Sequence, residues 1–242
     1  WNKLDKENLS EELVETFDLY LNSKSYRWSS KFWRHLAMNH LNLIASDKNK
    51  NYENIISQEY FTFTYFNEPL IKSACQEIHE KKFNLNVNLF KKQNNFTWTQ
   101  SINHNLILLL LYEIIRSKEI FKHFDKLKKI GAKNSRKLPS LTIDNSEITQ
   151  DDLNSLFEYE QIEKLLNKIS SPQGKFLEIG AGAGRTAKAL LSIKNNAKYV
   201  IADIPPAINF CLKNLRTYFP EKKIGMAFKL NEQSDLNAFL EK

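Results

Sequence analysis

The sequence predicts an α/β protein in which a mostly helical N-terminal domain, residues 1–148, precedes the N-terminal half of a parallel-sheet domain, residues 149–242. Two observations lead to this prediction. Apolar residues recur at helical spacing through most of the first part, whereas short apolar runs alternate with amphipathic helical segments from about residue 174 onward. Strands that alternate with helices form a parallel sheet with right-handed crossovers.

Composition narrows the class of protein. The 242 residues are 42% hydrophobic and carry a net charge of +7. The lysines are scattered among acids and asparagines, so a solvated surface is favoured over nucleic-acid binding. Cys75 and Cys211 lack metal-ligand spacing, which fits a reducing, cytoplasmic compartment. The longest apolar run, residues 106–112, is shorter than the roughly 20 residues of a membrane span and predicts a buried helix, with no membrane partner.

Capping residues and spacing place the N-terminal helices. Ser10 followed by Glu11 and Glu12 is typical of a helix start, because a hydroxyl caps the helix and carboxylates lie at the positive end of its dipole. A second helix is expected from Ser29 or Ser30. Residues 60–66 alternate like a strand between helical neighbours, so strand and helix are equally supported. Helices are also expected over 69–81, over 102–117 and up to Gly131, followed by a polar linker over 132–148.

The second part of the chain begins with a capping pair. Thr149 and Asp152, three residues apart, predict a helix through residue 169. Strands and helices then alternate: a strand over 175–180, a helix over 186–193, a strand over 198–203, a helix over 205–218, a strand over 223–228 and a helix over 235–241.

The first of these strands ends in a glycine-rich loop, FLEIGAGAGR, residues 176–185. In a parallel sheet this loop lies at the carboxyl end of the strands, where ligands bind, and glycines let a ligand touch the backbone. The dinucleotide fingerprint needs a small residue where this chain has Arg185, and the Gly-Lys-Ser/Thr of a P-loop is absent. A tight turn without any ligand is the alternative.

Asp203 ends the next strand, 23 residues after Gly180. Adjacent parallel strands lie about 5 Å apart, so its carboxylate is expected beside the glycine loop, where it can accept hydrogen bonds from both ribose hydroxyls of an adenosine. The alternative is an N-cap for the helix whose first turn holds Pro205. The two roles are compatible.

The pattern E-x-G-x-G-x-G, with Glu178 as its acid and Asp203 after it, resembles motif I of class I S-adenosylmethionine-dependent methyltransferases. The stretches KFLEIGAGAGRTAKALLS and YVIADIPPAINFCLKNLRTYFP are similar to the sugar O-methyltransferase family, over roughly residues 174–230. This resemblance implies a Rossmann-like methyltransferase fold with strand order 3-2-1-4-5-7-6. The sequence holds the first three strands, and the others are expected beyond Lys242.

The resemblance implies S-adenosylmethionine as cofactor and an O-methyltransferase acting on a sugar or glycan-precursor hydroxyl. Another small hydroxylated metabolite as acceptor, or a non-catalytic S-adenosylmethionine-binding module, are the alternatives. Glu178 would bind the methionine amino group, directly or through water, or else hydrogen-bond loop amides. The residues expected to bind the cofactor are Glu178, Gly180, Ala181, Gly182, Gly184, Asp203 and Ile204.

No catalytic residue or metal ligand can be assigned from the sequence. Tyr159 and Glu158 precede the first strand and are expected either near the cofactor or in helix packing. The tryptophans Trp28, Trp33 and Trp98 either cover the acceptor or, as such residues more often do, form core. An oligomer formed through the helical domain is a further hypothesis. The five histidines are expected to be surface or packed residues: His35, His40, His79, His104 and His123.

Overall fold

A computed structural model describes residues 9–46, 87–93, 96–131, 138–168, 174–194, 196–222 and 224–225. The predicted elements at 60–66 and 69–81 lie outside these residues. The protein is a mixed helix-and-sheet, broadly α/β structure. Its contacts divide the chain into unit 1, Trp1–Tyr60, Gln173–Ala187 and Lys194–Lys242, and unit 2, Phe61–Pro172 and Lys188–Ile193. The expected boundary between two separately folding domains, after residue 148, stays a prediction.

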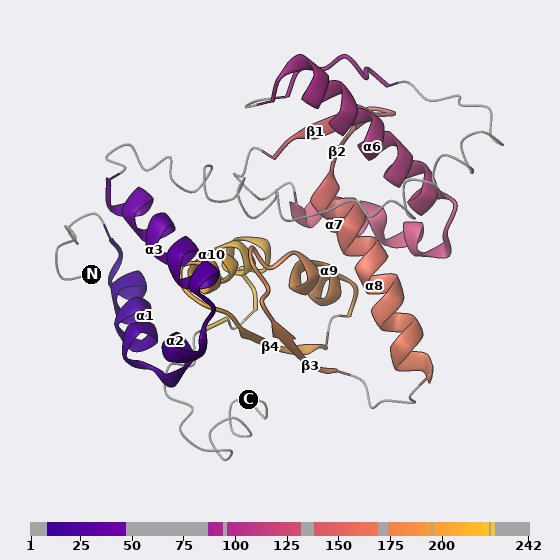
Figure 1. Cartoon of the computed structure of the whole chain (residues 1–242). Helices are drawn as coiled ribbons and strands as arrows, with labels where there is room; N and C mark the ends of the chain where they lie inside the picture. Colours follow the sequence, from indigo (N-terminus) through magenta and orange to yellow (C-terminus); the bar gives the residue numbers. More distant parts are fainter. Residues whose placement is uncertain are drawn as a thin grey trace. The chain divides into compact units, whose positions relative to one another are not determined.

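Unit 1 begins with three helices, α1 (Glu11–Asn22), α2 (Lys24–Trp28) and α3 (Lys31–Ser46), drawn in indigo in Figure 1. The Ser10 hydroxyl accepts a hydrogen bond of 3.3 Å from the Leu13 amide, so the predicted start of α1 is confirmed. Ser30 does the same for the Trp33 amide at the start of α3, as expected for the second helix.

Helices α1 and α3 share an apolar core. Its buried side chains come from α1 and α3, and Ile204 and Phe210, from the chain after β4, pack against it. A hydrogen bond of 3.1 Å from the Asn209 amide to the Thr16 hydroxyl also joins these segments. The N-terminal helices of unit 1 therefore support the loop that carries Asp203. The core residues are Leu13, Phe17, Ala37, Leu41 and Ile44.

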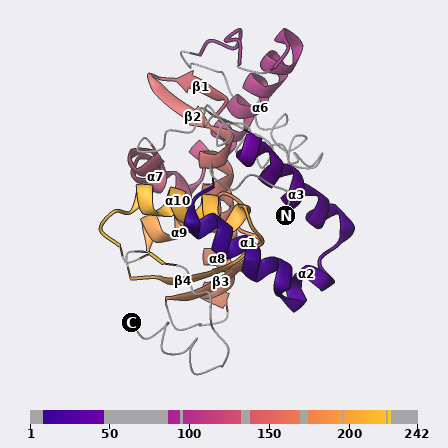
Figure 2. The same ribbon diagram turned by 90° about the vertical axis from the view of Figure 1, so that its left-hand side faces the viewer.

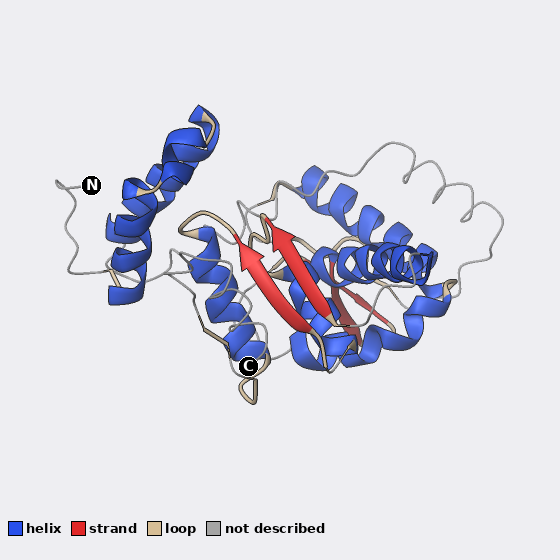
Figure 3. Ribbon diagram, turned by 90° about the horizontal axis from the view of Figure 1, so that it is seen from below, coloured by secondary structure: helices blue, strands red, loops and turns tan. Residues whose placement is uncertain are grey.

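The sheet of unit 1 consists of β3 (Lys175–Ile179) and β4 (Lys198–Ala202), which run parallel with Lys175 opposite Lys198. Figure 3 shows them as neighbouring red arrows that point the same way. Helix α9 (Arg185–Ile193) connects them and α10 (Ala207–Tyr218) follows, so the predicted order of strand, helix, strand and helix is confirmed. Apart from Ile224 and Gly225, the expected elements at 223–228 and 235–241 lie outside the described residues.

Unit 2 contains the helices α6 (Trp98–Arg116), η1 (Glu119–His123), α7 (Phe124–Gly131) and α8 (Gln150–Lys168). Helix α6 begins four residues before its predicted start at 102, because Thr97 and Gln100 form a reciprocal capping box. The apolar run inside it is largely buried, as expected. None of the described helices has both the length and the apolar character needed to cross a membrane.

The prediction of a linker over residues 132–148 is wrong for its second half. Residues Ser140–Ile143 (β1) and Ser146–Thr149 (β2) form an antiparallel hairpin, visible beside α6 in Figure 2. Its turn residues Asp144 and Asn145 have φ of 47° and 63°, a conformation that these two residue types tolerate. The apolar side chains of the hairpin are too few to stand out in the sequence, yet each is fully buried: Leu141, Ile143 and Ile148.

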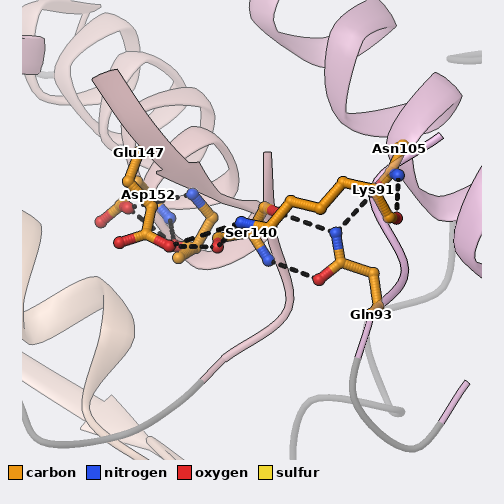
Figure 4. A network of polar contacts seen from close by, with 7 residues as sticks. Lys91, Gln93, Asn105, Ser140, Glu147 and Asp152 are labelled. Atoms are coloured by element: carbon orange, nitrogen blue, oxygen red, sulfur yellow. Dashed lines mark hydrogen bonds and ion pairs between the residues drawn. The ribbon is translucent and has the colours of Figure 1, made fainter. Parts of the chain in front are cut away.

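Three buried polar residues, which we call the amide clasp, hold this hairpin against α6: Gln93, Asn105 and Ser140 (Figure 4). The Gln93 amide nitrogen donates to Asn105 Oδ1 and to the Ser140 carbonyl, each at 2.7 Å, and its oxygen accepts from the Ser140 amide at 3.1 Å. Asn105 donates in turn to the carbonyls of Leu89 and Lys91. The side-chain amide donors of Gln93 and Asn105 thus all bind protein acceptors.

A buried ion pair lies at the N-terminus of α8. Asp152 and Thr149 form the predicted capping pair, and Lys188 donates to Asp152 Oδ1 at 2.8 Å with both charged side chains almost fully buried. Burial by itself would raise the pKa of Asp152. The Lys188 charge and the hydrogen bonds from Lys188 and Thr149 outweigh it, so the pKa is lowered. Sequence reasoning recognised the cap but not the lysine partner.

Candidate functional site

The glycine loop follows β3 directly. The Gly180 amide donates to the Ala202 carbonyl at 2.8 Å, which continues the pairing with β4, and the Gly184 amide donates to the Ala181 carbonyl at 2.9 Å, which closes a tight turn. All three glycines have positive φ: 77° at Gly180, 55° at Gly182 and 79° at Gly184. Other residues rarely adopt this conformation, so the turn itself requires the glycines.

The surroundings of the three glycines differ. A Cβ at Gly180 or Gly182 would meet no atom within 4 Å, whereas at Gly184 it would lie 2.7 Å from Cys211 Sγ and 3.5 Å from Leu215 Cγ. The backbone is therefore open to a ligand at the first two positions and packed against α10 at the third. Sequence reasoning grouped all three as cofactor residues. A ligand contact at Gly184 or at the buried Ala181 stays a prediction.

Asp203 joins the glycine loop to the end of β4. Its Oδ2 accepts from the Gly182 amide and its Oδ1 from the Ile204 amide, each at 2.7 Å. The expectation that the carboxylate lies beside the loop is confirmed. Burial raises the pKa of Asp203, and the hydrogen bonds from the two amides offset part of that rise.

The hypothesis that Asp203 caps the following helix is wrong. Helix α10 begins at Ala207, its N-cap is Pro206, and no side chain caps it by a hydrogen bond. The two amides that bind Asp203 lie before this helix. The carboxylate holds the loop instead.

Glu178 lies on β3, two residues before the loop. Its Oε2 accepts a hydrogen bond of 2.9 Å from the Tyr199 hydroxyl on β4. Sequence reasoning missed Tyr199, although the parallel register of the two strands would have indicated that their side chains share a face. The two alternatives for Glu178, an amino group or loop amides, stay open.

Ile204, the last predicted cofactor residue, is half-buried and packs against the core of α1 and α3. A further contact secures the loop from the other side: Asn214 on α10 donates to the Ala183 carbonyl at 3.0 Å. Asn214 is a buried polar residue one turn after Cys211, and a buried asparagine on an apolar helix face is the signal that could have found it.

Two other candidate residues, Tyr159 and His104, are buried. Tyr159 is buried in unit 2 and donates to Glu163, and burial raises its pKa, which fits helix packing. Burial lowers the pKa of His104 to about 4, so it is neutral at pH 7. Of the two alternatives for Trp33 and Trp98, core burial is wrong, because they are 43% and 59% exposed. A contact with the acceptor stays a prediction.

No catalytic or metal site stands out elsewhere in the described ranges. No group of three or more His, Cys, Asp or Glu there could hold a metal ion. His79 and the side chain of Trp28 lie outside what the structure describes. Comparison with protein-family models, with curated proteins and with solved structures gave no significant match.

Proposed function

We propose that the glycine loop and Asp203 bind S-adenosylmethionine, and that the chain is part of an S-adenosylmethionine-dependent O-methyltransferase with a Rossmann-like fold. The observation that carries this proposal is the hydrogen bond of 2.7 Å between the Gly182 amide and Asp203. It joins an open glycine loop and a carboxylate at the carboxyl ends of two parallel strands, where α/β folds bind nucleotides.

The residues present fit an adenosine-containing cofactor. The open backbone at Gly180 and Gly182 offers a surface that a Cβ would obstruct. A carboxylate has about four lone-pair sites, and the amides of Gly182 and Ile204 use two of them, so Asp203 keeps capacity for a ribose diol. Ile204, held by the core of α1 and α3, offers an apolar side chain next to it.

These residues would act by binding and orientation. S-adenosylmethionine supplies an activated methyl group when bound. Asp203 would fix the ribose, and the glycines would let the cofactor approach the backbone, which places the transferable group before an acceptor arrives.

The acceptor class rests on the resemblance to the sugar O-methyltransferase family. We propose a sugar or glycan-precursor hydroxyl as the acceptor, in a cytoplasmic enzyme. A different small hydroxylated metabolite is the nearest alternative, and a binding module without turnover is the other. An oligomer through the helical part would be compatible with each of these functions.

The test separates the ribose contact from the support that Asp203 gives the loop. Asp203→Asn keeps the size of the side chain but removes its charge, so affinity for S-adenosylhomocysteine should fall about 10- to 100-fold, since hydrogen bonds to charged groups contribute about 1.5–3 kcal/mol. An analogue without ribose hydroxyls should bind the unaltered protein similarly weakly, and the substitution should weaken that analogue little further. Calorimetry on the 242-residue chain measures all four affinities.

The outcomes distinguish the roles of Asp203. An equal loss for both ligands would mean that Asp203 only holds the loop, and the ribose contact would be rejected. Failure of S-adenosylhomocysteine to bind the folded, unaltered protein would reject the proposed function itself.

A further inference from the structure

Asn214 is a polar residue on the buried face of α10. It is only 9% exposed, and its side-chain amide nitrogen donates to the Ala183 carbonyl of the glycine loop at 3.0 Å. The buried residues around it on the helix are Ala207, Cys211, Leu212, Leu215 and Tyr218. Burying an amide is costly unless it is hydrogen-bonded, so its bond to the loop, rather than packing, accounts for an asparagine on this face.

Asn214 and Asp203 hold consecutive residues of the loop from two sides. Asp203, which follows β4, accepts from the Gly182 amide at 2.7 Å, and Asn214, on α10, donates to the Ala183 carbonyl. The backbone dihedral angles of Gly182 and Ala183 lie between these two groups. Gly182 has no side chain to limit its conformations, and its φ of 55° lies in the left-handed region. Two fixed ends therefore restrict the part of the loop whose backbone is open.

Helix α10 supports this contact because it also touches the next residue of the loop. A Cβ at Gly184 would lie 2.7 Å from Cys211 Sγ and 3.5 Å from Leu215 Cγ, so the helix and the loop are closely packed there. Asn214 lies between Cys211 and Leu215 in the sequence, among the buried residues of the helix. The position of the Ala183 carbonyl is thus set by a packed helix.

On these grounds we infer that Asn214 is a positioning residue: through the Ala183 carbonyl it holds the open backbone at Gly182 in the conformation that the cofactor meets. A loop that is already ordered loses less conformational entropy when a ligand binds, so this contact raises affinity without touching the ligand. The inference rests on the proposed function, because it needs a ligand that crosses the loop. The role of Asp203 differs, since it is specific to the ribose.

Binding of two ligands tests this role. Asn214→Leu removes the amide donor, keeps a similar side-chain volume and suits the apolar surroundings. We expect affinity for S-adenosylhomocysteine to fall about 5- to 10-fold, as for loss of a hydrogen bond, and affinity for the analogue without ribose hydroxyls to fall by the same factor. Asp203→Asn, by contrast, should weaken the analogue little. Asn214→Ala, which adds no bulk, should give the same pattern as Asn214→Leu.

Hydrogen exchange in the unliganded protein gives a second readout that needs no ligand. Loss of the Asn214 contact should speed exchange of the Gly182 amide about 5- to 10-fold, because the loop opens more often. The Gly180 amide, which donates to the Ala202 carbonyl at 2.8 Å, should exchange as before. A general loss of stability would speed exchange of both amides, whereas a positioning role changes only that of Gly182.

Asn105→Leu is a control of the same chemistry in unit 2. The Asn105 side-chain amide donates to the carbonyls of Leu89 and Lys91, so this substitution also takes a buried asparagine donor away from backbone acceptors. It should lower the melting temperature and leave both affinities and the exchange of the Gly182 amide unchanged. Melting curves should show each variant folded at the temperature of the binding measurement.

The outcomes separate this inference from the proposed function. Unchanged affinities with unchanged exchange at Gly182 would overturn the inference, and so would a loss confined to S-adenosylhomocysteine, which would mean that Asn214 acts on the ribose. If the unaltered, folded protein bound neither ligand, the proposed function would be rejected. Faster exchange at Gly182 in Asn214→Leu would even then show that Asn214 holds the loop.

Discussion

Two regions of the molecule bury polar groups, and they use them differently. In the amide clasp of unit 2, Gln93 and Asn105 direct their donors to protein acceptors within the core. In the glycine loop of unit 1, Asp203 holds the loop by the amides of Gly182 and Ile204, while the space above Gly180 and Gly182 stays open. A polar network whose partners are all internal stabilises a fold, whereas one that borders open backbone is suited to a ligand.

The largest effect on stability is expected at the buried ion pair of unit 2, between Asp152 and Lys188. Asp152→Ala leaves the Lys188 ammonium without its carboxylate, and breaking such a buried pair costs about 3–5 kcal/mol in the free energy of unfolding. Urea unfolding measures this loss. The double variant Asp152→Asn with Lys188→Met removes both charges and should recover most of the stability. A loss below about 1 kcal/mol would contradict the prediction.

The ion pair of Asp152 and Lys188 also predicts that the stability of the fold depends on pH. Because the pKa of Asp152 is lowered in the folded protein, its stabilisation is present above the unfolded pKa of about 4 and is lost as the pH falls through the folded pKa. The difference in stability between the unaltered protein and Asp152→Ala should therefore shrink in acid.

A smaller loss in the free energy of unfolding is expected at the amide clasp. Gln93→Leu removes hydrogen bonds from Asn105 Oδ1 and from both backbone groups of Ser140. At the lower end of the cost of a buried group left without a partner, about 1 kcal/mol each, we expect a loss of about 3 kcal/mol in all. Gln100→Leu is the matched control, since Gln100 is exposed and contributes only to a helix cap of about 1 kcal/mol. Equal losses in the two variants would show that the clasp is not a closed stabilising network.

The smallest losses of stability are expected for alanine substitutions within the glycine loop. Alanine at Gly182 suffers only the strain of positive φ, about 1–2 kcal/mol, whereas alanine at Gly184 also collides with Cys211 Sγ and should lose about 1–3 kcal/mol more. Thermal and urea unfolding compare the two. Cys211→Ala should relieve part of the loss in Gly184→Ala and none in Gly182→Ala.

Ligand binding should be affected more by substitution of Gly182 than of Gly184, which is the opposite of the order expected for stability. Gly182→Val should abolish binding of S-adenosylhomocysteine in a protein that stays folded, because its side chain would occupy the open space above the loop. Unchanged affinity, measured by calorimetry, would reject the open glycine as a binding position.

Much of the fold was predictable because it depends on neighbours in sequence. The start of α1 at Ser10, the cap formed by Thr149 and Asp152, and the order of strands and helices over residues 175–218 all follow from short-range spacing. The hairpin over 140–149 was missed, since its few apolar residues become a core only when α6 and the amide clasp cover them.

The sequence by itself determined which chemistry the candidate site holds: three glycines at a turn that requires positive φ, and an aspartate at the end of the adjacent parallel strand. Only the tertiary structure decided how these residues are used. It packed Gly184 against Cys211, joined Asp203 to Gly182 and placed the Tyr199 hydroxyl on Glu178. The physical reason is that conformational preference is local and can be read from neighbouring residues, whereas each of these contacts joins residues more than 20 positions apart and exists only after the chain has folded.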